Sequence, residues 1–382
     1  MAGQLFRSGP KLPRSGAARL VRLILAGIGI PVLVFILLEG LLSTLLFSWE
    51  VLNEGHLRRL HVKHDAELGW VGKPDVDFPD MYGPGVYLRT NSQGFRGRRD
   101  FNEAVPPGKR RVICAGDSVT FGFGVDDHHS WCRLLESLDG RLETVNMGLP
   151  AYGVDQAYLW YKRDAARFQH HVNILAPITD DFTRMRLSRF RGYGKPVLAL
   201  EDGQLVVRNI PVSERRYRLL WVTDRLQHLR SLRLWEAVQR IRRRLAPTPR
   251  PEGMSPEGMS KEEQNRRTAQ VIAKLLEDLK QVNVSRSSTL VVVYLPTLDS
   301  GLPETAFWVS VLDRECRALG IPFVNLAEAF DNFSYDEAME FFLPGDLGHF
   351  SVKGNQYMAK LIYDRLRRIP EVSRIVFADD RR

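Results

Sequence analysis

The sequence has little cysteine. Its 382 residues contain only Cys114, Cys132 and Cys316, and an odd number so widely spaced argues against a disulfide framework. No Cys/His spacing typical of a zinc site occurs. We therefore expect neither a metal nor a cofactor. Cys114 is predicted to be a buried apolar filler, and a Cys132–Cys316 bridge remains an option for a chain in an oxidising compartment.

Long apolar runs are also scarce, and only one is long enough to cross a bilayer core. From Leu23 to Phe47 the single charge is Glu39, and a basic tail precedes this run. No small-residue cleavage site follows it, so we expect an uncleaved transmembrane anchor over 23–47. By the positive-inside rule, residues 1–22 stay in the cytoplasm and the remainder is exported.

Acidic residues are outnumbered, 45 against 54 basic ones, for a net charge of +9. Such a balance often indicates nucleic-acid binding. An exported protein rarely meets nucleic acid, so we expect no such partner and favour an anionic membrane surface or an acidic polysaccharide. An arginine-rich helix is predicted over about 215–245. It exposes a solvated face, or it binds a membrane surface or the substrate.

From about residue 107 onward, short apolar strands alternate with helices, which predicts βαβ units. The expected fold class is α/β: a three-layer, doubly wound, flavodoxin-like parallel sheet of about five strands, preceded by one N-terminal transmembrane helix. The predicted strands are Arg111–Ala115, Leu142–Met147, Asn173–Ile178, Thr289–Leu295 and Pro322–Leu326, and the predicted helices lie near 128–138, 154–168, 262–281, 304–318 and 352–368. The remaining parts are a connector over 48–106 that packs on the main domain (107–370), an insertion at about 184–260 with a hairpin near 196–207, and a tail over 371–382.

Four polar segments follow or flank these predicted strands. They are Gly116-Asp117-Ser118, Asn146-Met147-Gly148, Thr179-Asp180-Asp181 and Asp346-Leu347-Gly348-His349. Because the carboxyl ends of parallel strands meet at one edge of a sheet, we expect the four segments to converge there. A serine, a histidine and an acid at one place are the minimum for nucleophilic acyl chemistry.

The order and content of these segments resemble those of the SGNH (GDSL) hydrolase superfamily of serine esterases and acyl-transfer enzymes. The resemblance implies that Ser118 is the nucleophile, His349 the general base and Asp346 the residue that orients the base. It also implies an oxyanion hole formed by the backbone N–H groups of Ser118 and Gly148. The residues that it marks as supporting the motifs are Gly116, Asp117, Asn146 and Asp181.

The third segment departs from the family pattern. Asp180 stands where the family has an asparagine whose amide donates to the oxyanion. An ionised carboxylate cannot donate a hydrogen bond, and it repels a developing negative charge. Since one lost donor costs on the order of 10²–10³ in rate, Asp180 is a doubtful member of the oxyanion hole. It serves only if it is protonated, and the alternative is that Thr179 or a nearby residue supplies the donor.

The upstream segments Leu68-Gly69-Trp70 and Thr90–Gly97 resemble those of a bacterial subgroup found with cell-envelope and exopolysaccharide systems. The resemblance implies an inner-membrane-anchored esterase with a periplasmic catalytic domain. It would remove small acyl groups, O-acetyl above all, from an envelope or exopolysaccharide. An acylated carbohydrate is then the substrate, and a polysaccharide biosynthesis complex is a further partner.

Three alternatives stay open. They are a polysaccharide O-acetyltransferase with the same triad, a catalytically degenerate polysaccharide-binding component, and a lipid-ester hydrolase. The adjacent histidine pairs His128-His129 and His170-His171 are predicted to lie at the surface rather than in the site.

Overall fold

A computed structural model describes residues 15–52, 61–190, 193–214, 259–298, 303–344, 346 and 348–377; for 15–26 and 46–52 it describes the backbone alone. The chain divides into two compact units. The first comprises residues 1–56 and 215–249, and the second comprises 57–214 and 250–382.

The described part of the first unit is one long helix, α1 (Ser15–Leu52). Within it, the 19 residues Gly27–Leu45 have a mean hydropathy of 2.2 and are long enough to cross a membrane. Their apolar side chains face outward; Ile28 and Leu37, for example, are more than 60% exposed. The predicted basic helix over about 215–245 lies outside the described residues.

The second unit is built on a five-stranded, all-parallel sheet, as predicted. Its strand order is β13-β12-β7-β5-β6. This is the flavodoxin-like order, because β5, the first of the five along the chain, lies between β6 and β7, the second and third. The strands are β5 (Arg110–Gly116), β6 (Leu142–Gly148), β7 (Val172–Ala176), β12 (Thr289–Tyr294) and β13 (Phe323–Asn325).

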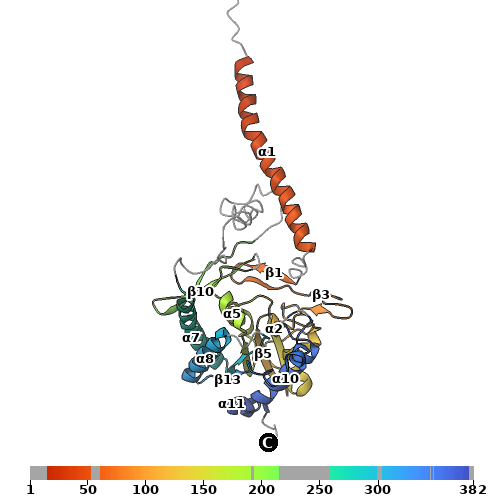
Figure 1. Ribbon diagram of the computed structural model, residues 1–382, viewed down its shortest axis with the longest axis vertical. Helices are drawn as coiled ribbons and strands as arrows, with labels where there is room; N and C mark the ends of the chain where they lie inside the picture. Colours follow the sequence, from red (N-terminus) through yellow and green to blue (C-terminus); the bar gives the residue numbers. More distant parts are fainter. Residues whose placement is uncertain are drawn as a thin grey trace, which may run out of the picture. The chain divides into compact units, whose positions relative to one another are not determined.

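Helices cover both faces of this sheet, which makes the predicted three layers (Figure 1). Successive side chains of a strand point to opposite faces, so Ile113 of β5 joins one core cluster and Val112 the other. The first cluster contains residues of α4 (Val154–Trp160), α7 (Lys261–Ser285) and α8 (Pro303–Leu319), and the second contains residues of α3 (Trp131–Leu138) and α10 (Val352–Leu366).

The cysteine predictions were right about burial and wrong about pairing. Cys114 of β5 is buried, as predicted, but it forms a disulfide with Cys132 of α3. The two face each other in the same core layer, with Cα atoms 6.3 Å apart. Cys316 of α8 is buried on the opposite face of the sheet, out of reach of Cys132, and is a free thiol.

Short hairpins flank the sheet. Residues 61–106 form two of them, and this segment also joins the edge of the sheet, where the Arg96 amide donates to Asn146 O of β6 (3.1 Å). The predicted hairpin near 196–207 is confirmed as β10 (Val197–Glu201) and β11 (Gln204–Arg208). The other short strands are β1 (Val62–Asp65), β2 (Gly69–Gly72), β3 (Asp77–Phe78), β4 (Leu88–Arg89), β8 (Arg189–Phe190) and β9 (Tyr193–Gly194).

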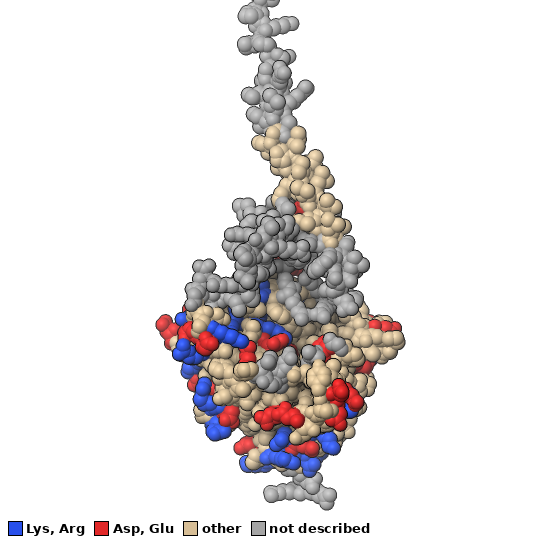
Figure 2. Space-filling view, in the orientation of Figure 1, with Lys and Arg blue, Asp and Glu red and all other residues tan. Residues whose placement is uncertain are grey.

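The remaining helices are short. They are α2 (Ser118–Phe121), α5 (Thr179–Arg184), α9 (Tyr335–Met339) and α11 (Pro370–Val372), with single turns at Asp127–His129, Tyr161–Ala165 and Ser373–Phe377. Because α2 follows β5 and α5 follows β7, both begin at the carboxyl end of the sheet (Figure 1). On the visible face, acidic and basic side chains are interspersed over the second unit (Figure 2).

Candidate active site

Ser118 lies at the carboxyl end of a central strand, as its motif predicts. Strand β5 ends at Gly116, and Asp117 then caps helix α2 by accepting a hydrogen bond from the Val119 amide (2.8 Å). Ser118 is the first residue of that helix and is only 7% exposed. The rigid strand and the capped helix together fix the position of its hydroxyl group.

A loop just before α10 brings the predicted base and acid to Ser118. His349 Nε2 lies 2.8 Å from Ser118 Oγ, and His349 Nδ1 lies 2.7 Å from Asp346 Oδ2. The Gly348 amide donates to the other oxygen of Asp346 (3.0 Å) and so fixes this carboxylate. A carboxylate at Nδ1 favours the tautomer with its proton there, which leaves Nε2 free to accept the serine proton. The three side chains thus form one continuous hydrogen-bonded chain.

The charge of Asp346 suits this arrangement. Partial burial works against its ionised form, but the hydrogen bond and charge of His349 outweigh it and hold the pKa of Asp346 below its ordinary value. The imidazole is also held by packing, because the ring of Phe123 lies 4.6 Å from the His349 ring, centroid to centroid. Gly124, at a φ of 83°, lets the turn after α2 approach the Leu343 side chain.

The predicted oxyanion donor Gly148 is already bonded. Its amide donates to the side-chain oxygen of Asn146 (2.9 Å), while the Asn146 amide group donates to Thr120 O (2.8 Å). A side chain at Gly148 would collide with the backbone of Thr120 and Phe121, so the glycine is needed for close packing against α2. Contrary to the expectation, Gly148 offers no free donor here. Among the described residues, the Ser118 amide has no acceptor and is available.

Asp180 does not replace the missing donor. Its side chain is 75% exposed, and its one ion pair among the described residues is with Arg184 Nη2 (3.5 Å). Its neighbour Asp181 is buried and accepts a hydrogen bond from the Ile178 amide (3.1 Å). The third segment therefore supports the site through Asp181 and offers only a carboxylate at position 180.

Arg184 is a residue of the site that the motifs did not reveal. Its Nη1 donates to Asp181 (2.6 Å), to Asp117 (2.9 Å) and to Tyr152 O (3.0 Å). Asp117 and Asp181 are both buried, so Arg184 supplies their shared countercharge. The one available signal was its spacing three residues after Asp181 on a helix, which is a common ion-pair spacing.

The two histidine pairs are not part of the hydrogen-bonded triad Ser118, His349 and Asp346. His128 is exposed, as predicted. The prediction for His170 was wrong, because this ring is 2% exposed and bonds to Tyr161 Oη and Phe168 O. His171 Nδ1 lies 3.1 Å from the backbone nitrogen of Arg111, at the start of β5. All of these contacts are structural.

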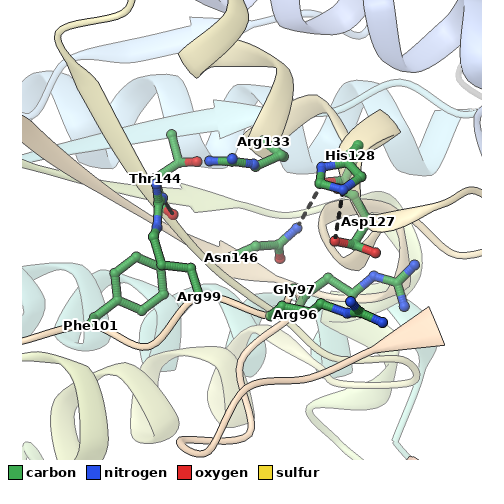
Figure 3. Close-up of a pocket in the computed structure, with 11 residues that line it drawn as sticks. Arg96, Gly97, Arg99, Phe101, Asp127, His128, Arg133, Thr144 and Asn146 are labelled. Atoms are coloured by element: carbon green, nitrogen blue, oxygen red, sulfur yellow. Dashed lines mark hydrogen bonds and ion pairs between the residues drawn. The ribbon is translucent and has the colours of Figure 1, made fainter. Parts of the chain in front are cut away.

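A separate pocket of about 150 Å³ lies beside β6 and does not contain the triad (Figure 3). Asp127, His128 and the neighbouring Asp126 are close enough to share a metal ion. However, Arg89 Nη1 lies 3.3 Å from Asp127 and 3.8 Å from Asp126, so a guanidinium already neutralises these carboxylates. The pocket is lined by Arg96, Gly97, Arg98, Arg99, Phe101, Asp127, His128, Ser130, Arg133, Thr144 and Asn146.

No model of a known protein family matches the chain, and no curated protein matches it in sequence. Among solved structures, the chain is similar to GDSL-type lipolytic hydrolases. One is the lipase/acylhydrolase from Enterococcus faecalis, 12% identical, with 68% of this chain and 96% of that chain covered and a TM-score of 0.39. Another is a lipolytic protein of the G-D-S-L family from Veillonella parvula, 11% identical, with 68% and 98% covered and a TM-score of 0.36.

The inhibitor-bound aryl esterase of M. smegmatis is a third similar structure. It is 12% identical, with 68% of this chain and 99% of that chain covered and a TM-score of 0.38. At such identities and scores the similarity says nothing about individual residues. Their roles rest on the contacts described above.

Proposed function

We propose that the chain is a membrane-anchored serine esterase that removes small acyl groups from an acylated carbohydrate. The observation that carries this proposal is the continuous chain Asp346–His349–Ser118, with hydrogen-bond distances of 2.7 and 2.8 Å. These are the contacts that general-base activation of a serine requires.

The reaction proceeds by an acyl-enzyme. His349 Nε2 takes the proton of Ser118 Oγ while this oxygen attacks the ester carbonyl carbon. The resulting imidazolium, stabilised by Asp346, then gives the proton to the leaving alcohol as the ester C–O bond breaks. In the second half, His349 removes a proton from water, which attacks the acyl carbon; the bond to Ser118 Oγ then breaks, His349 returns the proton to this oxygen, and the acid is released.

Two features favour action outside the cytoplasm. Helix α1 carries an apolar segment long enough to span a membrane, and basic residues precede this segment. The Cys114–Cys132 disulfide is typical of proteins in oxidising compartments. We therefore propose an inner-membrane anchor with the catalytic unit on the periplasmic side.

A groove of about 740 Å³ supports a large polar substrate. It is lined by Met185 and Arg186, by residues of the β10–β11 hairpin and by residues of α7. Arginine and glutamine side chains line it beside apolar ones, a mixture suited to a hydroxylated polymer. The polar side chains are Arg186, Arg208, Glu263, Gln264, Arg267, Thr268 and Gln270.

The proposal is tested with the full chain in detergent micelles. We expect it to hydrolyse p-nitrophenyl acetate and to react with a fluorophosphonate probe, and we expect Ser118→Ala to abolish both reactions. Wild-type protein that shows neither reaction would overturn the catalytic proposal. With an acetylated oligosaccharide and an unacetylated acceptor, acetate released faster than transferred product supports an esterase, and the reverse supports the O-acetyltransferase.

A further inference from the structure

One cation joins the ends of three strands at the site. Arg184 Nη1 donates to Asp117 after β5, to the carbonyl oxygen of Tyr152 after β6, and to Asp181 after β7. The Arg184 side chain is only 11% exposed, so these charges interact with little screening by water. This arrangement is more than a local helix contact, because it holds together the loops that surround Ser118.

The same contacts bear on the serine proton. Ser118 Oγ has a single proton and two neighbouring acceptors, His349 Nε2 at 2.8 Å and Asp117 Oδ2 at 3.3 Å. Only the bond to His349 leads to a nucleophile. An ionised Asp117 without a partner would be the stronger acceptor, because charged acceptors form the stronger hydrogen bonds.

Arg184 bonds to that same oxygen, Asp117 Oδ2, at 2.9 Å. The guanidinium therefore offsets the charge of the competing acceptor and restrains its position. Burial and the nearby Asp117 raise the pKa of Asp181 well above its ordinary value, although Arg184 opposes them. One guanidinium thus bonds to two buried acidic side chains.

We infer that Arg184 is a positioning residue for the nucleophile, which by holding Asp117 Oδ2 directs the Ser118 proton to His349. The inference rests on the proposed esterase function and deepens it. Arg184 acts through Asp117 and does not itself contact the reacting atoms. Its loss should lower the rate of acylation and leave substrate binding nearly unchanged.

The test compares p-nitrophenyl acetate turnover by the full-length wild type, Arg184→Lys and Arg184→Met. A lysine keeps the charge without the fork that reaches several acceptors, so we expect kcat to fall about tenfold, and about 100-fold for methionine. KM should stay within about threefold in both variants. The matched control is Arg163→Met, because Arg163 also pairs with carboxylates, Asp65 at 2.9 Å and Asp164 at 2.8 Å, and belongs neither to the site nor to the lining of the groove. It should retain wild-type kcat.

A double variant separates positioning from plain structural support. Asn is as good a helix cap as Asp, so Asp117→Asn should keep α2 intact while removing the charged competitor for the proton. Added to Arg184→Met, it should restore kcat at least about tenfold. A purely structural role predicts no rescue, since a second contact of the network is lost. If Arg184→Met does not fold, the same rescue is measured on Arg184→Lys.

The outcomes are distinct from failure of the proposed function. A wild type without Ser118-dependent turnover would overturn the esterase itself. With an active wild type, either of two results would overturn the role of Arg184: Arg184→Met turns over like Arg163→Met, or the double variant is no faster than Arg184→Met.

Discussion

Ser118 is flanked by the residues that activate it and by those that should stabilise the oxyanion, and the hydrogen bonds are in place only on the first side. On the activation side, His349 and Asp346 already form the hydrogen bonds that catalysis needs. On the oxyanion side, the Gly148 amide is bonded to Asn146 and position 180 carries an exposed carboxylate. The nucleophile is prepared before substrate arrives, whereas the charge that it creates on the substrate oxygen meets few donors.

This difference indicates which step limits the enzyme. Removing a proton from Ser118 needs no rearrangement, so activation should not be slow. Stabilising the oxyanion rests on the Ser118 amide unless substrate binding frees another donor, and such donors are usually the largest electrostatic contribution. We therefore expect changes on the activation side to lower the rate steeply, and suitable changes on the oxyanion side to raise it.

Among these predictions, the largest effect should come from replacing Asp346, the acid on the activation side. Asp346→Asn removes the acceptor that holds His349 Nδ1–H and stabilises the imidazolium, so kcat should fall about 10³- to 10⁴-fold. The measurement is p-nitrophenyl acetate turnover at saturating substrate, with the exposed Asp336→Asn in α9 as the control. A loss of less than tenfold would contradict the assigned role of Asp346.

The next effect concerns the strand that presents the nucleophile. The Cys114–Cys132 bridge closes a loop with a sequence separation of 18 residues between β5 and α3. Such a loop predicts a stabilisation of about 3 kcal/mol, so Cys132→Ser should lower the free energy of unfolding by about that amount. Guanidinium unfolding followed by tryptophan fluorescence measures it. Cys316→Ser is the matched control. It keeps the bridge, so a reductant should lower its free energy of unfolding by as much as it does in the wild type.

A pH effect should come from His61, which is 1% exposed and packs against Phe121 of α2 with ring centroids 5.4 Å apart. Burial, with a contribution from the charge of Arg96, lowers the pKa of His61 to about 3. In the unfolded chain its pKa is near 6.5, so below that pH protons bind the unfolded state preferentially. The free energy of unfolding should therefore fall by about 1.4 kcal/mol for each unit by which the pH is lowered between about pH 6.5 and 3.

The measurement is the free energy of unfolding at pH 7 and pH 5. His61→Leu should lose about 2 kcal/mol less than wild type over this interval, because the titrating group is gone. The exposed His128→Asn should behave like wild type. Equal losses in wild type and His61→Leu would show that His61 is not buried in its neutral form.

The smallest effect should come from the oxyanion side, and it should be a gain. Asp180→Asn replaces an acceptor by an amide that can donate to the oxyanion, and it gives up only an exposed ion pair with Arg184. We expect kcat to rise up to about tenfold, less than a fully aligned donor supplies. A fall in kcat would mean that the charge of Asp180 is needed to hold Arg184, and would reverse the comparison of the two sides.

The sequence was enough to predict the five-stranded sheet, because short apolar strands alternate with helices over most of its length. It was also enough to bring Ser118, Asp346 and His349 to one place, because parallel strands share a carboxyl edge. It could not show that the Gly148 amide donates a hydrogen bond to Asn146, since every residue except proline has the same backbone N–H group. Nor could it pair Cys114 with Cys132, because the pairing depends on which face of the sheet each cysteine occupies.

Arg184 shows a different kind of limit. Its partners Asp117, Tyr152 and Asp181 lie after three different strands, so their meeting point depends on the strand order in the finished sheet. A spacing rule detects at most the contact with Asp181 on the same helix. The contact with the nucleophile's own neighbour emerges only in three dimensions.

The distance along the chain between Ser118 and His349 has a consequence for synthesis. The two are 231 residues apart, whereas the disulfide that braces the Ser118 strand joins cysteines 18 residues apart. As the chain is made from its N-terminus, the braced strand can form early, and the loop with the base arrives among the last segments. Chains terminated before His349 would therefore carry the serine without its base, and hydrolysis would begin only after the loop with His349 has been made.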